Sequence, residues 1–197
     1  MAKLHFRYGT VGSGKTLDLL KVAYNYEENG MNCIILTSSI DDRYGNDIVK
    51  SRTGLSRPAT SISEKTNIYN LIKNINKKID SILVDEIQFF TKEHVYQLAK
   101  IVDELDIPVI CYGLRSDFMH QPFGCAVNLM AIADVLEEIK TICSHCGKKK
   151  STINGKFVNG KLINIGKQVE IGGNEKYKPL CRKCYMKLLD DKSFITN

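Results

Sequence analysis

The chain has no apolar run of about 20 residues, the length that crosses a bilayer, and this absence excludes a membrane-spanning helix. Residues 1–5, Met-Ala-Lys-Leu-His, lack the apolar core of a secretory signal peptide. We therefore expect a cytoplasmic protein with no membrane partner. Thiols stay reduced in that compartment, so the seven cysteines are not expected to form a disulfide scaffold. The chain also carries no internal repeat and no low-complexity segment.

Charge is unevenly distributed along the chain. Residues 141–197 hold 12 of the 28 Lys and Arg residues but only 4 of the 22 Asp and Glu residues. A basic tail often binds nucleic acid, but this one lacks the interleaved aromatic residues on which bases stack. We interpret it as solvated lysines around a small metal-bound module and predict no nucleic-acid partner.

The most informative motif is Gly-Thr-Val-Gly-Ser-Gly-Lys-Thr at residues 9–16, which fits the phosphate-binding P-loop. Alternating polar and apolar residues precede it and apolar residues at helical spacing follow it, so it stands between a predicted strand and a predicted helix. We expect Lys15 to reach the terminal phosphates of a nucleotide and the Thr16 hydroxyl to bind Mg²⁺. The rest of the loop is expected to cradle the phosphates with backbone N–H groups. Its members are Gly9, Thr10, Val11, Gly12, Ser13 and Gly14.

Strand and helix patterns alternate through the first 140 residues. Apolar strands are predicted at 3–8, 33–36, 81–84 and 107–112, with helices after the P-loop and near 66–78 and 92–104. This alternation predicts an α/β fold with a parallel sheet covered on both faces. Residues 38–65 are polar and are predicted to form a long mobile loop. The composition changes near Thr141, which predicts a nucleotide-binding domain at 1–141, a small module at 142–190 and a tail at 191–197.

Asp85 and Glu86 follow the apolar residues 82–84 in the manner of a Walker B strand. We expect Asp85 to hold Mg²⁺, directly or through water. Glu86 is a candidate general base, because a carboxylate beside the transferred phosphoryl group can accept the proton of an attacking hydroxyl.

Two Cys-x-x-Cys knuckles flank the basic module. Cys143 with Cys146, and Cys181 with Cys184, supply four thiolates for one tetrahedral zinc ion. A closed shell of four cysteines predicts a structural zinc rather than a catalytic one, and two matched knuckles argue against a redox dithiol. His145 lies inside the first knuckle and is a weaker candidate ligand.

The polar segment contains three arginines, Arg43, Arg52 and Arg57, and each is a candidate to neutralise charge on a transferred phosphate. The residue pattern does not choose among them. Phe89, Phe90, Phe118 and Phe123 follow predicted strands and are candidates for an apolar pocket around a flat ring, since open α/β sheets bind ligands at the carboxyl ends of their strands.

Taken together, these motifs resemble type II thymidine kinases, the zinc-containing cytosolic family. The resemblance covers about residues 3–186 and rests on the order of five motifs. They are the P-loop, Ile-Asp-Asp-Arg-Tyr at 40–44, Val-Asp-Glu-Ile-Gln-Phe-Phe at 84–90, Tyr-Gly-Leu-Arg-Ser-Asp-Phe at 112–118, and Ile-Gly-Gly-Asn-Glu-Lys-Tyr at 171–177 closed by the second knuckle.

The resemblance implies a P-loop, RecA-like parallel sheet flanked by helices and a C-terminal zinc "lasso" domain. It implies transfer of the γ-phosphate of ATP to the 5′-hydroxyl of thymidine, or of deoxyuridine, in nucleotide salvage. ATP, Mg²⁺ and structural Zn²⁺ are the implied cofactors. A homotetramer and feedback inhibition by thymidine triphosphate are also implied.

The resemblance further assigns residues to roles. Glu86 matches the catalytic base, and Arg43 matches the arginine that faces the phosphates. The implied nucleotide site extends from the P-loop to Asp85, Glu86, Ile87 and Gln88. Lasso backbone near 168–174 would bond the thymine edge. The implied nucleoside contacts are Phe89, Leu114, Phe118, Phe123, Ile171, Gly172, Gly173 and Tyr177.

Two departures from the family pattern affect the thymine pocket rather than the catalytic set. Val11 stands where the family often has Met, and residues 148–156 lack the usual threonine-rich, arginine-bearing strand. Two other protein classes are alternatives. A nucleic-acid-dependent ATPase would use the basic module as a grip, and a GTP switch would need an Asn-Lys-x-Asp signature, which the chain lacks.

Overall fold

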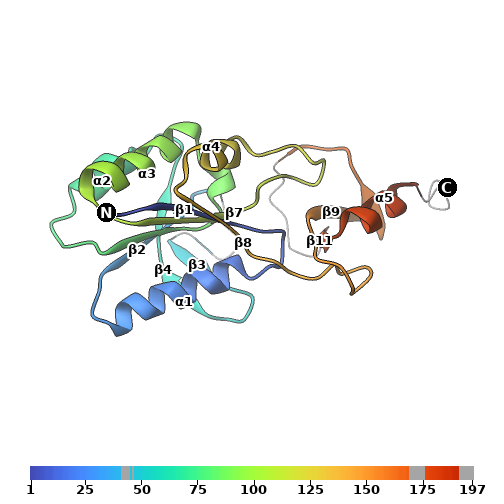
Figure 1. Cartoon of the computed structure of the whole chain (residues 1–197), viewed down its shortest axis with the longest axis horizontal. Helices are drawn as coiled ribbons and strands as arrows, with labels where there is room; N and C mark the ends of the chain where they lie inside the picture. Colours follow the sequence, from blue (N-terminus) through green and yellow to red (C-terminus); the bar gives the residue numbers. More distant parts are fainter. Residues whose placement is uncertain (41–44, 46, 169–175, 191–197) are drawn as a thin grey trace.

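The computed structural model describes residues 1–40, 45, 47–168 and 176–190, and all structural statements concern these. A six-stranded sheet dominates this part of the chain (Figure 1), with strand order β5-β2-β6-β7-β1-β8. Every neighbouring pair is parallel, which confirms the predicted parallel sheet. The strands are β1 (Leu4–Tyr8), β2 (Cys33–Ser38), β5 (Thr60–Ile62), β6 (Ser81–Val84), β7 (Val109–Gly113) and β8 (Val135–Glu138).

Helices cover both faces of the sheet, as predicted. Helix α1 (Lys15–Glu28) packs Leu19, Leu20 and Ala23 into one apolar cluster on its face. On the other face a larger cluster includes Val95, Leu98 and Val102, which share one side of α3. Figure 1 shows α1 on one side of the sheet and the remaining helices of this domain on the other. These are α2 (Ile68–Lys73), the 3-10 turn η1 (Ile87–Phe89), α3 (Lys92–Leu105) and α4 (Gly124–Ile132).

Helix α3 begins with a capping box formed by Thr91 and His94. The Thr91 side chain accepts from the His94 backbone N–H at 3.2 Å, and His94 Nδ1 accepts from the Thr91 N–H at 3.2 Å. The far ring nitrogen, Nε2, lies 2.9 Å from the Thr66 carbonyl oxygen. This buried histidine therefore fixes the start of α3 and ties it to the segment just before α2.

The interpretation of residues 38–65 as one long loop is wrong. The segment contains an antiparallel hairpin, β3 (Ile48–Lys50) and β4 (Ser56–Pro58), and then β5 of the main sheet. The α2 helix is also shorter than the predicted 66–78 span. Helix α4 and strand β8 were not predicted at all.

A second, antiparallel sheet with order β10-β9-β11 follows the main sheet. It contains β9 (Ile153–Val158), β10 (Lys161–Ile163) and β11 (Tyr177–Leu180), and helix α5 (Arg182–Asp190) packs beside it. Figure 1 shows this module beyond one end of the main sheet. Its own apolar cluster includes Leu180 and Tyr185. The boundary between residues 141 and 142 stays a prediction.

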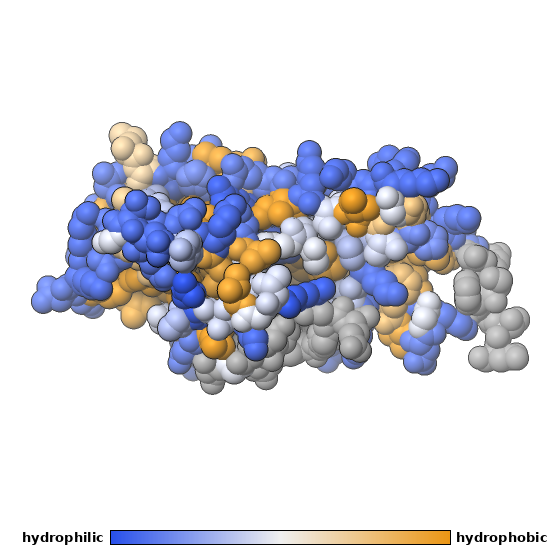
Figure 2. Space-filling model, turned by 90° about the horizontal axis from the view of Figure 1, so that it is seen from below, coloured by the Kyte–Doolittle hydropathy of each residue, from blue (hydrophilic) through white to orange (hydrophobic). Residues whose placement is uncertain are grey.

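Among the described helices, none combines the length and the apolar character needed to cross a membrane. The surface seen from the side of α1 is mostly hydrophilic, with small apolar areas between polar side chains (Figure 2).

Candidate active site

The P-loop joins β1 to α1 and is held together by its own backbone. Gly12 and Gly14 have φ angles of 69° and 86°, in the left-handed region that favours glycine. Gly14 is the residue before α1, so the loop turns directly into the helix N-terminus. The Lys15 ammonium is buried and donates to the carbonyls of Gly9 (3.2 Å) and Thr10 (2.9 Å). This arrangement places a cation, a helix N-terminus and turned backbone at one point, which suits an anion such as phosphate.

Gly9 allows a close approach that no other residue permits. A Cβ atom there would lie 2.4 Å from the Ile139 carbonyl oxygen and 2.5 Å from Ser13 Oγ. The Gly9 N–H donates to the Gly113 carbonyl at 3.2 Å, which ties the loop to the end of β7.

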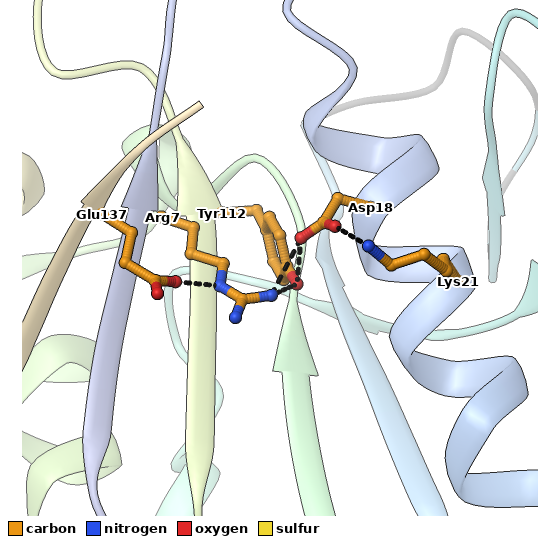
Figure 3. Close-up of polar contacts among 5 residues, drawn as sticks. All are labelled: Arg7, Asp18, Lys21, Tyr112 and Glu137. Carbon is orange, nitrogen blue, oxygen red and sulfur yellow. Dashed lines mark hydrogen bonds and ion pairs between the residues drawn. The ribbon is translucent and has the colours of Figure 1, made fainter. Parts of the chain in front are cut away.

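A polar network clamps the two elements on either side of the P-loop (Figure 3). Arg7 of β1 donates to Asp18 of α1 at 2.9 Å and to the Tyr112 hydroxyl at 3.0 Å, and Tyr112 donates to Asp18 at 3.1 Å. Lys21 pairs with Asp18, and Arg7 also donates to Glu137 of β8. Burial opposes ionisation of Asp18, but the bonds and charges of Lys21 and Arg7 lower its pKa. We infer that this network fixes the angle between β1 and α1.

Asp85 directly follows β6 and faces the P-loop. The Thr16 hydroxyl donates to Asp85 Oδ2 at 3.1 Å, while Asp85 Oδ1 is buried and has no hydrogen-bond partner among the described residues. Burial, reinforced by the charge of Glu86, raises the pKa of Asp85 to about 7, although Thr16 and Lys15 oppose the shift. An unsatisfied carboxylate beside a threonine hydroxyl is the donor set that a hard cation such as Mg²⁺ prefers.

Glu86 is held by a relay through Gln88. Glu86 has a φ angle of 50°, and the Gln88 amide nitrogen donates to its carboxylate. The Gln88 amide oxygen accepts from the Leu114 backbone N–H at 2.9 Å. A Cβ atom on Gly113 would lie 2.6 Å from that same oxygen. The relay therefore requires glycine at position 113. Glu86 is therefore fixed relative to the end of β7, as a general base must be.

One cavity of about 360 Å³ brings most of the predicted residues together. From the P-loop, Val11, Gly12, Gly14, Lys15 and Thr16 line it, followed by Asp85, Glu86 and Gln88. All five described members of the predicted nucleoside set line it as well: Phe89, Leu114, Phe118, Phe123 and Tyr177. The cavity thus runs from the phosphate loop to a set of aromatic side chains, called the aromatic end below.

Some predicted residues lie elsewhere. Gly9, Thr10 and Ser13 do not line the cavity, and Ile87 and Phe90 are buried in the apolar core instead. Arg43 and the segment 171–173 lie outside the described residues. Of the other two candidate arginines, Arg52 lines the cavity, whereas Arg57 pairs with Glu27 of α1 at 3.2 Å.

The C-terminal module contacts the P-loop through two residues that the sequence did not indicate. The Ser151 and Thr10 hydroxyl oxygens lie 2.7 Å apart. Asn154 accepts from the Val11 backbone N–H at 2.9 Å and donates to the Ser116 carbonyl at 2.9 Å. Single polar residues within a lysine-rich segment give no sequence signal of such a bridge. The sequence also did not indicate the β3–β4 hairpin, whose residues 48–53 line the cavity.

The four knuckle cysteines form one cluster, as predicted. The Sγ atoms of Cys143, Cys146, Cys181 and Cys184 all lie within 4.8 Å of one another. Zn–S bonds of about 2.3 Å in a tetrahedron put the sulfurs roughly 3.8 Å apart, so this spacing suits a single zinc ion.

The thiols of this cluster differ in acidity. Backbone N–H groups of Lys148 and Lys149 lower the pKa of Cys146 to about 6. Burial and the neighbouring thiols raise the pKa of Cys184 to about 12. A divalent cation would offset the mutual repulsion of four thiolates, so the donor set fits zinc.

Comparisons with known proteins agree with this geometry. The sequence model of a family described as "Thymidine kinase" matches residues 2–185. A thymidine kinase from Francisella tularensis subsp. tularensis is 53% identical over 191 residues, which cover 93% of this chain and 96% of that protein. A thymidine kinase from Listeria monocytogenes serotype 4b is 51% identical over 185 residues, with coverages of 94% and 97%. One from Streptococcus gordonii is 48% identical over 187 residues, with coverages of 95% and 97%.

Among solved structures, the flagellar accessory protein FlaH from Methanocaldococcus jannaschii aligns with a TM-score of 0.43 at 13% identity, covering 81% of this chain and 74% of that one. A similarity of this extent supports no conclusion about function.

Proposed function

The chain belongs to the thymidine kinase family, and from this we propose that it transfers the γ-phosphate of ATP to the 5′-hydroxyl of thymidine. The observation that carries the proposal is the single cavity that joins a P-loop, an Asp-Glu pair and an aromatic end. A phosphoryl donor and a nucleoside acceptor must meet in one place, and this cavity offers each of them suitable surroundings.

The phosphate end holds the groups needed for transfer. Backbone N–H groups of the P-loop and the Lys15 ammonium would hold the phosphates, and Thr16 with Asp85 would hold Mg²⁺. Bound Mg²⁺ supplies positive charge against the phosphate oxygens. Glu86 would accept the proton of the 5′-hydroxyl, which makes the oxygen a better nucleophile. Arg43 remains proposed, on the resemblance alone, as a further cation at the phosphates.

The aromatic end suits the nucleoside. Phe118 and Tyr177 lie with ring centroids 6.1 Å apart, and Phe118 is buried at 1% exposure. Leu114, Phe89 and Phe123 complete a set of apolar walls that would exclude larger bases. We propose that backbone of the lasso, near residues 168–174, bonds the thymine edge. Because uracil presents the same edge, deoxyuridine is a proposed second substrate.

Several finer properties are proposals that rest on family membership. They are a structural zinc on the four cysteines, a cytoplasmic location, a homotetramer and feedback inhibition by thymidine triphosphate. We propose no nucleic-acid partner, so ATP turnover should not depend on DNA or RNA.

Transfer from γ-labelled ATP tests the reaction class. With Mg²⁺ and thymidine, we expect the label in thymidine 5′-monophosphate, and we expect little ATP turnover without a nucleoside. Asp85→Asn should lower the rate strongly, since the carboxylate beside Thr16 is lost. Release of inorganic phosphate that rises with added DNA or RNA, with no labelled nucleotide, would instead favour a nucleic-acid-dependent ATPase.

A further inference from the structure

We propose that Tyr185 is a positioning residue that couples the zinc knuckle to the nucleoside end of the cavity. This inference rests on the proposed function, and it assigns a role in thymidine binding to a residue that does not contact the cavity. Tyr185 directly follows Cys184, is 1% exposed, and belongs to the apolar cluster of the zinc module. It does not line the cavity.

The Tyr185 hydroxyl is hydrogen-bonded to the backbone of Phe118, a residue that lines the cavity. It donates to the Phe118 carbonyl oxygen at 2.8 Å in a buried contact that links positions 67 residues apart. The His120 ring packs against the Tyr185 ring with centroids 4.4 Å apart. Both contacts fall on the loop that carries Phe118, so Tyr185 holds this loop from outside the cavity.

The loop that carries Phe118 is held together by its own hydrogen bonds. Asp117 Oδ1 accepts from the backbone N–H groups of Met119 (2.8 Å) and Gln121 (2.9 Å). An isolated β-bridge joins Ser116 to Pro122 across the loop base. Because the loop is tied internally, it should move as a unit when an outside contact is lost.

Other contacts from the zinc module reach the same loop. Arg115 donates to the Thr152 carbonyl at 3.1 Å, and Asn154 donates to that of Ser116 at 2.9 Å. The Lys156 ammonium lies 4.7 Å from the Phe118 ring centroid. These contacts come from β9 and from the residue just before it. Tyr185, by contrast, is the residue next to the zinc-knuckle cysteine Cys184. A metal bound at Cys181 and Cys184 would fix the first turn of α5, and with it the Tyr185 ring.

The test compares two tyrosine hydroxyl deletions in the full-length, zinc-loaded protein. Tyr185→Phe keeps the ring and the zinc ligands but removes the bond to Phe118. We expect the thymidine Kd, measured by calorimetry, and the thymidine KM to rise about threefold to tenfold, the range for one net hydrogen bond. The ATP KM and kcat should stay within about twofold, because Tyr185 touches neither the phosphates nor the reacting atoms.

Tyr69→Phe is the matched control. The Tyr69 hydroxyl bonds Glu104 at 2.7 Å on the outer surface between α2 and α3, so its loss should leave the thymidine Kd unchanged. Zinc content, measured by mass spectrometry, should be one ion per chain in both variants.

His120→Asn tests the same contact from the other side, and it can be used if Tyr185→Phe folds poorly. His120→Asn removes the ring packed on Tyr185, and Asn tolerates the φ of 65° found there. It should also raise the thymidine Kd selectively. An unchanged thymidine Kd in a folded, zinc-loaded variant, or equal losses for thymidine and ATP, would overturn the coupling. A wild-type protein that does not phosphorylate thymidine would overturn the proposed function instead.

Discussion

Replacement of Glu86 by Gln should lower kcat by about 10²–10⁴-fold, the usual contribution of a general base. The amide has nearly the same shape and can still accept from Gln88, so the relay to Leu114 should survive. It cannot accept the proton of the 5′-hydroxyl. The affinity for ATP should stay close to that of the wild type, because the P-loop contacts do not use this side chain.

Single-turnover rates and calorimetric ATP binding would measure both quantities. Glu104→Gln on the surface of α3 is a suitable control, since its carboxylate lies between α2 and α3 and not on the cavity. Near-normal turnover of the Glu86 variant would remove the base assignment, even with thymidine phosphorylation intact in the wild type.

Loss of the zinc site is the second change with a large expected effect. Cys181→Ser should leave far less than one zinc per chain, because a closed four-thiolate shell tolerates the loss of one ligand poorly. The module should then unfold locally, and thymidine KM should rise about tenfold or more. ATP binding should fall less, since β1 and α1 are held by the main-sheet clusters and by the Arg7–Asp18 network.

Metal analysis together with the KM values for both substrates would decide this. Cys33→Ser is the matched control, because Cys33 is a half-buried thiol of β2 that lies outside the cluster. Full zinc occupancy in the Cys181 variant would show that these four cysteines are not the binding site.

The site was largely predictable where the chemistry is local in the sequence. The P-loop, the Asp85–Glu86 pair and the knuckles each carry their residues within a few positions, and strand β6 (Ser81–Val84) was predicted to the residue. A parallel sheet then has to bring the ends of β1, β6 and β7 to one edge.

Other features left no periodic signal. Strands β3, β4 and β5 have three residues each, too few to show alternation. Helix α4 reads Gly-Cys-Ala-Val-Asn-Leu-Met-Ala-Ile, which is apolar on nearly every side, so no amphipathic stripe marks it.

Contacts between the module and the P-loop could not be foreseen from composition. The Thr10–Ser151 and Val11–Asn154 bonds join residues 141 and 143 positions apart. Only the folded backbone decides that these small polar side chains meet.

The most direct test of the central claim is kcat/KM for thymidine, deoxyuridine, deoxycytidine and deoxyguanosine, measured side by side with ATP and Mg²⁺. Thymine and uracil present the same O4 and N3–H, whereas cytosine exchanges both partners and would leave buried groups unpaired. We predict efficient use of thymidine, somewhat weaker use of deoxyuridine, and deoxycytidine and deoxyguanosine roughly 10³-fold or more below thymidine. Comparable efficiency on deoxycytidine, or no phosphorylation of thymidine, would contradict the account.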